Sequence, residues 1–154
     1  MLKKIALVVL LTAVLGAPSA LAFRLEGYNW GDSRTSVVDK LGKKGWALRS
    51  TRVEQLVEAD VFLGGEPCVA QFMFNSSLRL NKIRVTWDTT RVGNDIMKKL
   101  IQDFGNPNEA SPGSKHYMWK GSFKGEEITL DYSDLSGLPN NKTVIVFDGG
   151  NAYR

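Results

Sequence analysis

The side chains that could carry acid–base or metal chemistry are few. The 154 residues include one histidine, His116, and one cysteine, Cys68. A zinc site needs three or four His, Cys or carboxylate ligands, and the sequence holds no such cluster around His116. The acidic loop that binds calcium in EF-hands is absent as well. We therefore expect no metal, no cofactor and an ordinary surface role for His116.

Two carboxylates stand close together in the segment Asp131-Tyr132-Ser133-Asp134. General acid–base catalysis uses such a pair when its surroundings separate the two pKa values. The segment ends a predicted strand and enters a turn, where Asp and Ser are common because they bond to nearby backbone. A Ser-His-Asp triad could use only His116, and no G-x-S-x-G motif is present. We expect a protein that is not an enzyme, and keep a hydrolase based on Asp131 or Asp134 as an alternative.

Four tryptophans stand among basic residues, an arrangement that can stack on bases or sugars. However, the net charge of +4 is mild and no block of like charges occurs, so nucleic acid is not an expected partner. Trp87 and Trp119 fall on the predicted core face. Trp30 and Trp46 flank the first predicted helix. They leave open a second alternative, a small-ligand carrier with a cavity lined by these two residues and other aromatics.

Residues 1–22 have the three parts of a secretory signal peptide. A basic start at Lys3 and Lys4 is followed by an apolar run over residues 5–15 and by the small-x-small site Ala20-Leu21-Ala22. The apolar run is shorter than the ~18 residues that span a bilayer. We expect a periplasmic or secreted protein that begins near Phe23, forms one domain over residues 23–154 and keeps no stable membrane anchor after cleavage. Its oligomeric state stays open.

The single cysteine excludes an internal disulfide. Cys68 alternates in phase with Ala70, Phe72 and Phe74, which favours a buried, apolar role. An intermolecular bridge or a reactive thiol is the other interpretation. Because no internal disulfide can form, the stability of the fold must come from the hydrophobic core.

Apolar spacing predicts two helices, roughly Arg34 to Leu41 and Arg91 to Phe104, each ended by glycine. Residues 106–114 are expected to form a loop. Short turns link the predicted strands, so the sheet should be antiparallel. The strands are expected at residues 46–49, 55–63, 68–74, 78–87, 115–120, 126–132 and 143–147.

One octamer occurs twice, as Asn81–Asp88 and as Asn141–Asp148. The two helices also align without gaps, and each half has the order helix, strand, strand, strand. This order predicts an internal duplication with repeats over about 31–88 and 91–148. Each helix has one apolar stripe, so both should pack on the same face of one sheet. The fold class expected is α+β, with one antiparallel sheet of about six to eight strands.

Alternation along the strands assigns side chains to the two faces of the sheet. The face under the helices is expected to carry Val57, Val61, Phe72, Phe74, Ile83, Val85, Trp87, Trp119, Ile128, Leu130, Val144 and Val146. The other face mixes large apolar side chains with charges, which is typical of a site for a partner protein. The predicted partner-binding residues are Phe62, Met73, Arg84, Met118, Lys120, Ile145 and Phe147.

A leader followed by two helix-plus-sheet units resembles the β-lactamase-inhibitor-protein-like architecture. It is also similar to the small outer-membrane assembly lipoproteins. The opening Gly27-Tyr28-Asn29-Trp30-Gly31-Asp32-Ser33 looks like the start of many small periplasmic proteins. The inhibitors carry disulfides and the lipoproteins a lipidated N-terminal cysteine, whereas this chain has Cys68 alone. The resemblance therefore implies no functional residue, but it does imply that the open sheet face can dock a protein.

Overall fold

The computed structural model describes residues 27–121, 126–132 and 142–150. The expected leader, the expected start at Phe23 and the carboxylate Asp134 lie outside these ranges. The helices are α1 (Arg34–Lys43), α2 (Gly93–Phe104) and the 3-10 turn η2 (Pro112–Ser114). The strands are β1 (Ala47–Arg49), β2 (Leu56–Leu63), β3 (Glu66–Phe74), β4 (Leu80–Trp87), β5 (Glu109–Ser111), β6 (His116–Lys120), β7 (Glu127–Tyr132) and β8 (Thr143–Asp148).

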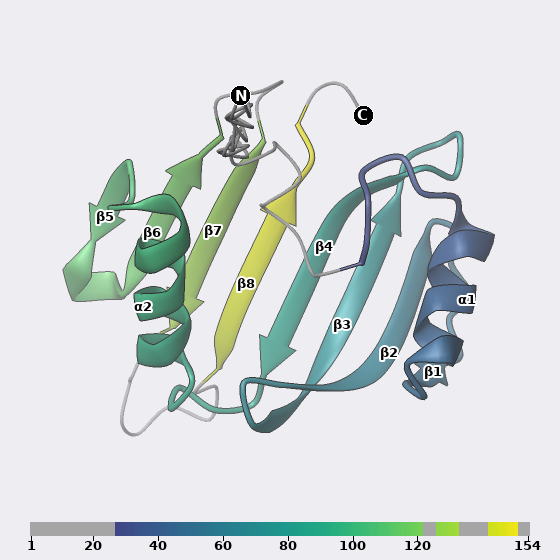
Figure 1. The fold of residues 1–154 in the computed structure, drawn as a ribbon, viewed down its shortest axis with the longest axis horizontal. Coiled ribbons are helices and arrows are strands. Elements are labelled where there is room, and N and C mark those ends of the chain that lie inside the picture. Colours follow the sequence, from purple (N-terminus) through teal and green to yellow (C-terminus); the bar gives the residue numbers. More distant parts are fainter. Residues whose placement is uncertain (1–26, 122–125, 133–141, 151–154) are drawn as a thin grey trace, which may run out of the picture.

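The strands form one antiparallel sheet with the order β1-β2-β3-β4-β8-β7-β6-β5. Both α-helices lie on the same side of this sheet, α1 toward the β1 end and α2 toward the β5 end (Figure 1). The α+β class and the single antiparallel sheet are thus confirmed. Within the described residues each half consists of one α-helix and four strands, and the halves meet where β4 pairs with β8. The duplication itself stays a prediction.

Local backbone contacts define the start of α1 and the end of α2. The Ser33 hydroxyl accepts a hydrogen bond from the Ser36 amide at 3.2 Å, which caps one of the free amides at the start of α1. Helix α1 then buries Val37 and Leu41 against the sheet. Helix α2 ends at Gly105, whose φ of 76° suits a residue without a β-carbon.

The start of α2 lies unusually close to the sheet at Gly93. A β-carbon at this position would come within 2.3 Å of the Tyr132 ring. The Tyr132 hydroxyl also donates to Oδ1 of Asn94 at 3.0 Å. The missing side chain of Gly93 therefore lets the first turn of α2 rest directly on β7.

A short arm before α1 covers part of the space between the two helices. The Gly31 amide donates to the Leu80 carbonyl at 2.8 Å, and the Leu80 amide donates to the Asp32 carbonyl at 2.9 Å. These bonds fasten the arm to the beginning of β4. Tyr28 then packs on Phe72, with ring centroids 4.8 Å apart.

Most of the predicted core face is buried, Cys68 included. The two predicted core tryptophans also satisfy their indole N–H groups. Trp87 Nε1 donates to the Leu63 carbonyl at 3.0 Å, and Trp119 Nε1 donates to the Gly105 carbonyl at 2.9 Å. This polar anchoring suits large aromatic side chains in a core.

Two predictions about the strands are wrong. The segment expected as a loop contains β5, whose three exposed residues pair with β6. In β8, Val144 and Val146 were expected under the helices but are half-buried on the opposite face. Thr143, Ile145 and Phe147 are the buried residues of this strand.

Among the described residues, no helix is long and apolar enough to cross a membrane.

Candidate functional site

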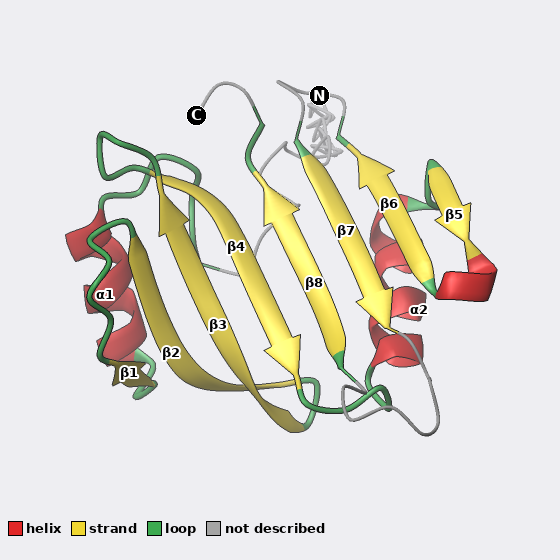
Figure 2. Cartoon of the chain, turned by 180° about the vertical axis from the view of Figure 1, so that it is seen from behind, coloured by secondary structure: helices red, strands yellow, loops and turns green. Residues whose placement is uncertain are grey.

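One face of the sheet carries neither α-helix. Figure 2 views the sheet from this side, with both α-helices behind the strands. Eight strands spaced about 4.8 Å apart make a surface roughly 35 Å wide. We call this surface the open face. Its side chains include five of the predicted partner-binding residues, Phe62, Met73, Arg84, Met118 and Lys120.

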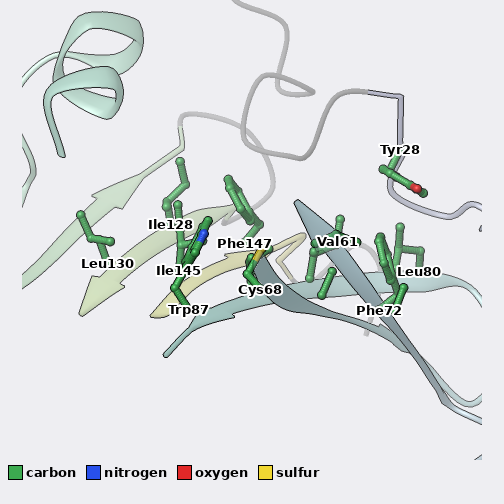
Figure 3. Close-up of a cluster of buried hydrophobic side chains, with 14 of the residues drawn as sticks. Tyr28, Val61, Cys68, Phe72, Leu80, Trp87, Ile128, Leu130, Ile145 and Phe147 are labelled. Atoms are coloured by element: carbon green, nitrogen blue, oxygen red, sulfur yellow. The ribbon is translucent and has the colours of Figure 1, made fainter. Parts of the chain in front are cut away.

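The other two predicted partner-binding residues do not lie on the open face. They lie on the helix side of the sheet, so their prediction is wrong. Ile145 is 4% exposed and Phe147 7% exposed, and both belong to the buried cluster under the helices. Figure 3 draws them in this cluster together with Trp87. The reason is the register: Ile145 pairs with Val85, and directly paired residues point to the same side of a sheet. The repeated octamer held this signal, because it aligns Ile145 with Val85.

Most charges on the open face are held by neighbours. Cross-strand pairs lie at both ends of the sheet and, between Lys82 and Asp148, on its two central strands. Nδ1 of His116 is 2.5 Å from Oδ1 of Asp131, and Lys120 contacts Glu109. The pairs Arg49–Asp60 and Lys82–Asp148 approach to 2.7 Å and 3.1 Å.

Arg84 differs from these paired groups. It is exposed near the middle of the open face, between Gln71 on β3 and Val146 on β8. Within the described part of the chain, no carboxylate lies within 4.0 Å of its guanidinium. Its neighbours on this face are of two kinds. Four are half-buried and apolar, Val69, Met73, Val144 and Val146, and four are polar or charged, Gln71, Lys82, Thr86 and Asp148. Arg84 is therefore an exposed guanidinium without an ion-pair partner among the described residues, and half-buried apolar side chains lie beside it on both neighbouring strands.

The His116–Asp131 pair gives the hydrolase alternative its geometry. Ser111 is the direct cross-strand partner of His116, so serine, histidine and aspartate occupy neighbouring strands on one face. No hydrogen bond joins the Ser111 hydroxyl to the imidazole in the described contacts, and all three side chains are accessible to solvent. A triad depends on that hydrogen bond and on oxyanion donors near the serine. The described contacts thus contain the His116–Asp131 contact of a triad and lack its serine contact.

A second feature lies on the helix side, beside α2. It is an apolar cavity of about 390 Å³, which we call the groove. Its floor is formed by Val85 and Trp87 of β4 and by Ile145 and Phe147 of β8, and its wall by α2. The β2–β3 hairpin adds Leu63 and Gly64. Charged groups enter the lining from α2 alone: Asp95, Lys99 and Asp103.

The groove differs from the aromatic cavity expected from the sequence. Trp30 is 6% exposed and packs against Gly149, where a β-carbon would come within 2.9 Å of its ring. Trp46 is half-buried beneath the Lys44 ammonium, 4.8 Å from the ring centroid. Neither residue lines the groove, and Trp87 does.

No group of three or more His, Cys, Asp or Glu side chains in the described ranges could hold a metal ion. Comparison of the chain with protein-family models, with curated proteins and with solved structures finds no match. The open face and the groove are therefore the two features of this structure that bear on its function.

Proposed function

We propose that the protein is an exported, non-catalytic interaction module that binds a partner protein with its open face. The observation that carries this proposal is the setting of Arg84, which is exposed without an ion-pair partner in the described chain and lies beside the half-buried apolar side chains of Val69, Met73, Val144 and Val146. Exposed apolar patches rimmed by charge mark interaction sites. Arginine is also among the residues that contribute most to binding when they lie near the centre of an interface.

The charge pattern indicates what the partner should present. Because the neighbouring charges of the open face are mostly paired, docking another surface on them disturbs existing ion pairs little. Arg84 instead offers five N–H donors that suit a carboxylate in bidentate geometry. The expected partner therefore places an Asp or Glu side chain on Arg84, surrounded by apolar side chains that cover Met73 and Val146.

The direct test is capture of partners from the native periplasm with matched baits. Arg84→Glu reverses the central charge of the open face. Lys98→Glu makes the same reversal on α2, where the side chain is 81% exposed. A partner of the open face should be captured by the wild-type and Lys98→Glu baits and lost with Arg84→Glu. A partner retained by Arg84→Glu but lost with Lys98→Glu would place the interaction on the helix side.

A purified partner then permits a quantitative test. Phe62 is 63% exposed and Met118 is half-buried, both on the open face. The double variant Phe62→Ser plus Met118→Ser should fold nearly as the wild type and bind more weakly by about 2 kcal/mol or more, the scale of interface hot spots. Isothermal titration calorimetry measures the affinity and circular dichroism the folding. Unchanged affinity in a folded double variant would contradict the proposal.

A further inference from the structure

The groove runs beside α2 along the length of the helix. Its lining begins with Val92, just before the helix, and reaches Phe104, the last helical residue. A helix of 12 residues is about 18 Å long at 1.5 Å per residue. A lining that follows the helix over this length accepts an unbranched chain lengthwise.

The floor of the groove favours an alkyl chain over an extended peptide. Strands β4 and β8 each pair with neighbours on both sides, so their backbone N–H and C=O groups are used within the sheet. The side chains above them are Val85, Trp87, Ile145 and Phe147, which offer an occupant almost no hydrogen-bond partners. An extended peptide lying there would bury backbone N–H and C=O groups without hydrogen-bond partners, at a cost of about 1–3 kcal/mol each. A hydrocarbon chain has no such groups to leave unsatisfied.

The rim of the groove carries charges of both signs. Lys99 Nζ lies 3.0 Å from Oδ2 of Asp103, and the two side chains are 73% and 40% exposed. Asp95, one turn earlier on α2, adds a further carboxylate, which lies 4.0 Å from the Lys98 ammonium. A ligand head that carries a cation and an anion can pair with the carboxylates and with Lys99 together. A head of one sign meets repulsion from one of these groups.

We propose that the groove binds a single-chain amphiphile with a zwitterionic head. The chain lies along β4 and β8 beneath α2, and the head lies at Lys99 and Asp103. The volume falls within the range of about 300–1,000 Å³ that is usual for small-molecule sites. This site is separate from the open face, because the groove is on the side of the sheet that carries the helices.

The binding test uses dodecylphosphocholine below its micelle concentration, titrated into the purified protein in a calorimeter. We expect saturable binding at one site. Hexylphosphocholine should bind on the order of a thousandfold more weakly, because six buried methylene groups are lost. Dodecanoate and dodecyltrimethylammonium have the same chain with a head of one sign, and both should bind more weakly than the zwitterion. Equal affinity for the two phosphocholines, or no saturable binding, would overturn the proposal. Equal affinity for the three dodecyl compounds would overturn the assignment of a zwitterionic head.

Two variants locate the site. Ile96→Trp places a larger side chain in the groove and should weaken dodecylphosphocholine binding by about tenfold or more. Gln102→Trp, at an exposed position of the same helix outside the lining of the groove, should leave binding unchanged. Unaltered binding in a folded Ile96→Trp protein would contradict the assignment.

A second readout does not depend on whether Ile96→Trp folds. The groove is lined by Trp87, so a phosphocholine with a brominated dodecyl chain should quench tryptophan fluorescence of the wild-type protein. The quenching should be largely lost in Trp87→Phe, which keeps an aromatic ring on the floor. Quenching that persists at full strength in Trp87→Phe would show that the chain binds elsewhere.

Discussion

Val85 and Ile145 stand directly opposite each other on the two central strands of the sheet. They are also equivalent positions of the repeated octamer. The pairing around them is reciprocal: Ile83 pairs with Phe147, the equivalent of Trp87, and Trp87 pairs with Thr143, the equivalent of Ile83. Reciprocal contacts of this kind are what a two-fold relation between identical units produces. One pair, Val85 with Ile145, fixes the rest of this antiparallel register, so the duplication itself stays a prediction.

The first prediction concerns the two faces of β8. Ile145→Ala removes a buried side chain and should lower the free energy of unfolding by about 2–5 kcal/mol. Val146→Ala, one residue further along on the open face, should cost less than about 1 kcal/mol. Urea unfolding followed by circular dichroism measures both. Equal losses in the two variants would contradict the face assignment.

The second prediction concerns the close approach of α2 to β7. Gly93→Ala should destabilise the protein by about 1–3 kcal/mol, because the added β-carbon would clash with the Tyr132 ring. Gly42→Ala in α1 is the matched control, since a β-carbon there meets nothing within 4 Å. This control should be neutral or stabilising by up to about 1 kcal/mol, the helix propensity difference. A stabilising Gly93→Ala, measured by thermal unfolding, would show that the contact is not tight.

The third prediction is a pH dependence that originates at Cys68. Burial raises the pKa of the Cys68 thiol to about 11, from an ordinary value of 9.0. The unfolded thiol ionises first, so the stability contributed by the buried neutral thiol is complete below about pH 9 and is lost as the pH rises toward 11. The loss should be on the order of 2 kcal/mol.

Cys68→Ala isolates this effect. The variant should lose less stability than the wild type between about pH 8 and about pH 10.5, as measured by urea unfolding. Burial and the nearby Asp32 raise the pKa of Tyr28 to about 12, and this residue is the same in both proteins. Parallel pH profiles of the two proteins would exclude the thiol as the cause.

The fourth prediction tests the non-catalytic assignment at the His116–Asp131 pair. Asp131→Asn removes the carboxylate that holds the imidazole, 2.5 Å away. We expect the wild-type and Asp131→Asn proteins to hydrolyse p-nitrophenyl esters at the same background rate. Ser111→Ala provides the corresponding control on β5. A rate that falls in both variants would support the hydrolase alternative instead.

Local sequence signals were sufficient for most of the secondary structure. The apolar stripe of α2 and the alternation around Phe72 repeat with periods that belong to one helix or one strand, so no distant residue is needed to detect them. The three residues of β5, Glu109–Ser111, carry no such pattern, because all of them are exposed. This strand exists through its pairing with β6, which local composition does not encode.

The sequence by itself determined the antiparallel order of elements, the burial of Cys68 and the scarcity of catalytic side chains. The tertiary structure decided which way β8 faces, because residues 143–147 are β-branched or aromatic throughout and have no polar alternation to set the phase. Only the register against β4 put Ile145 beside Val85 in the floor of the groove and Val146 beside Arg84 on the open face. Sheet pairing joins residues 60 positions apart, and a one-residue change of phase exchanges the two faces.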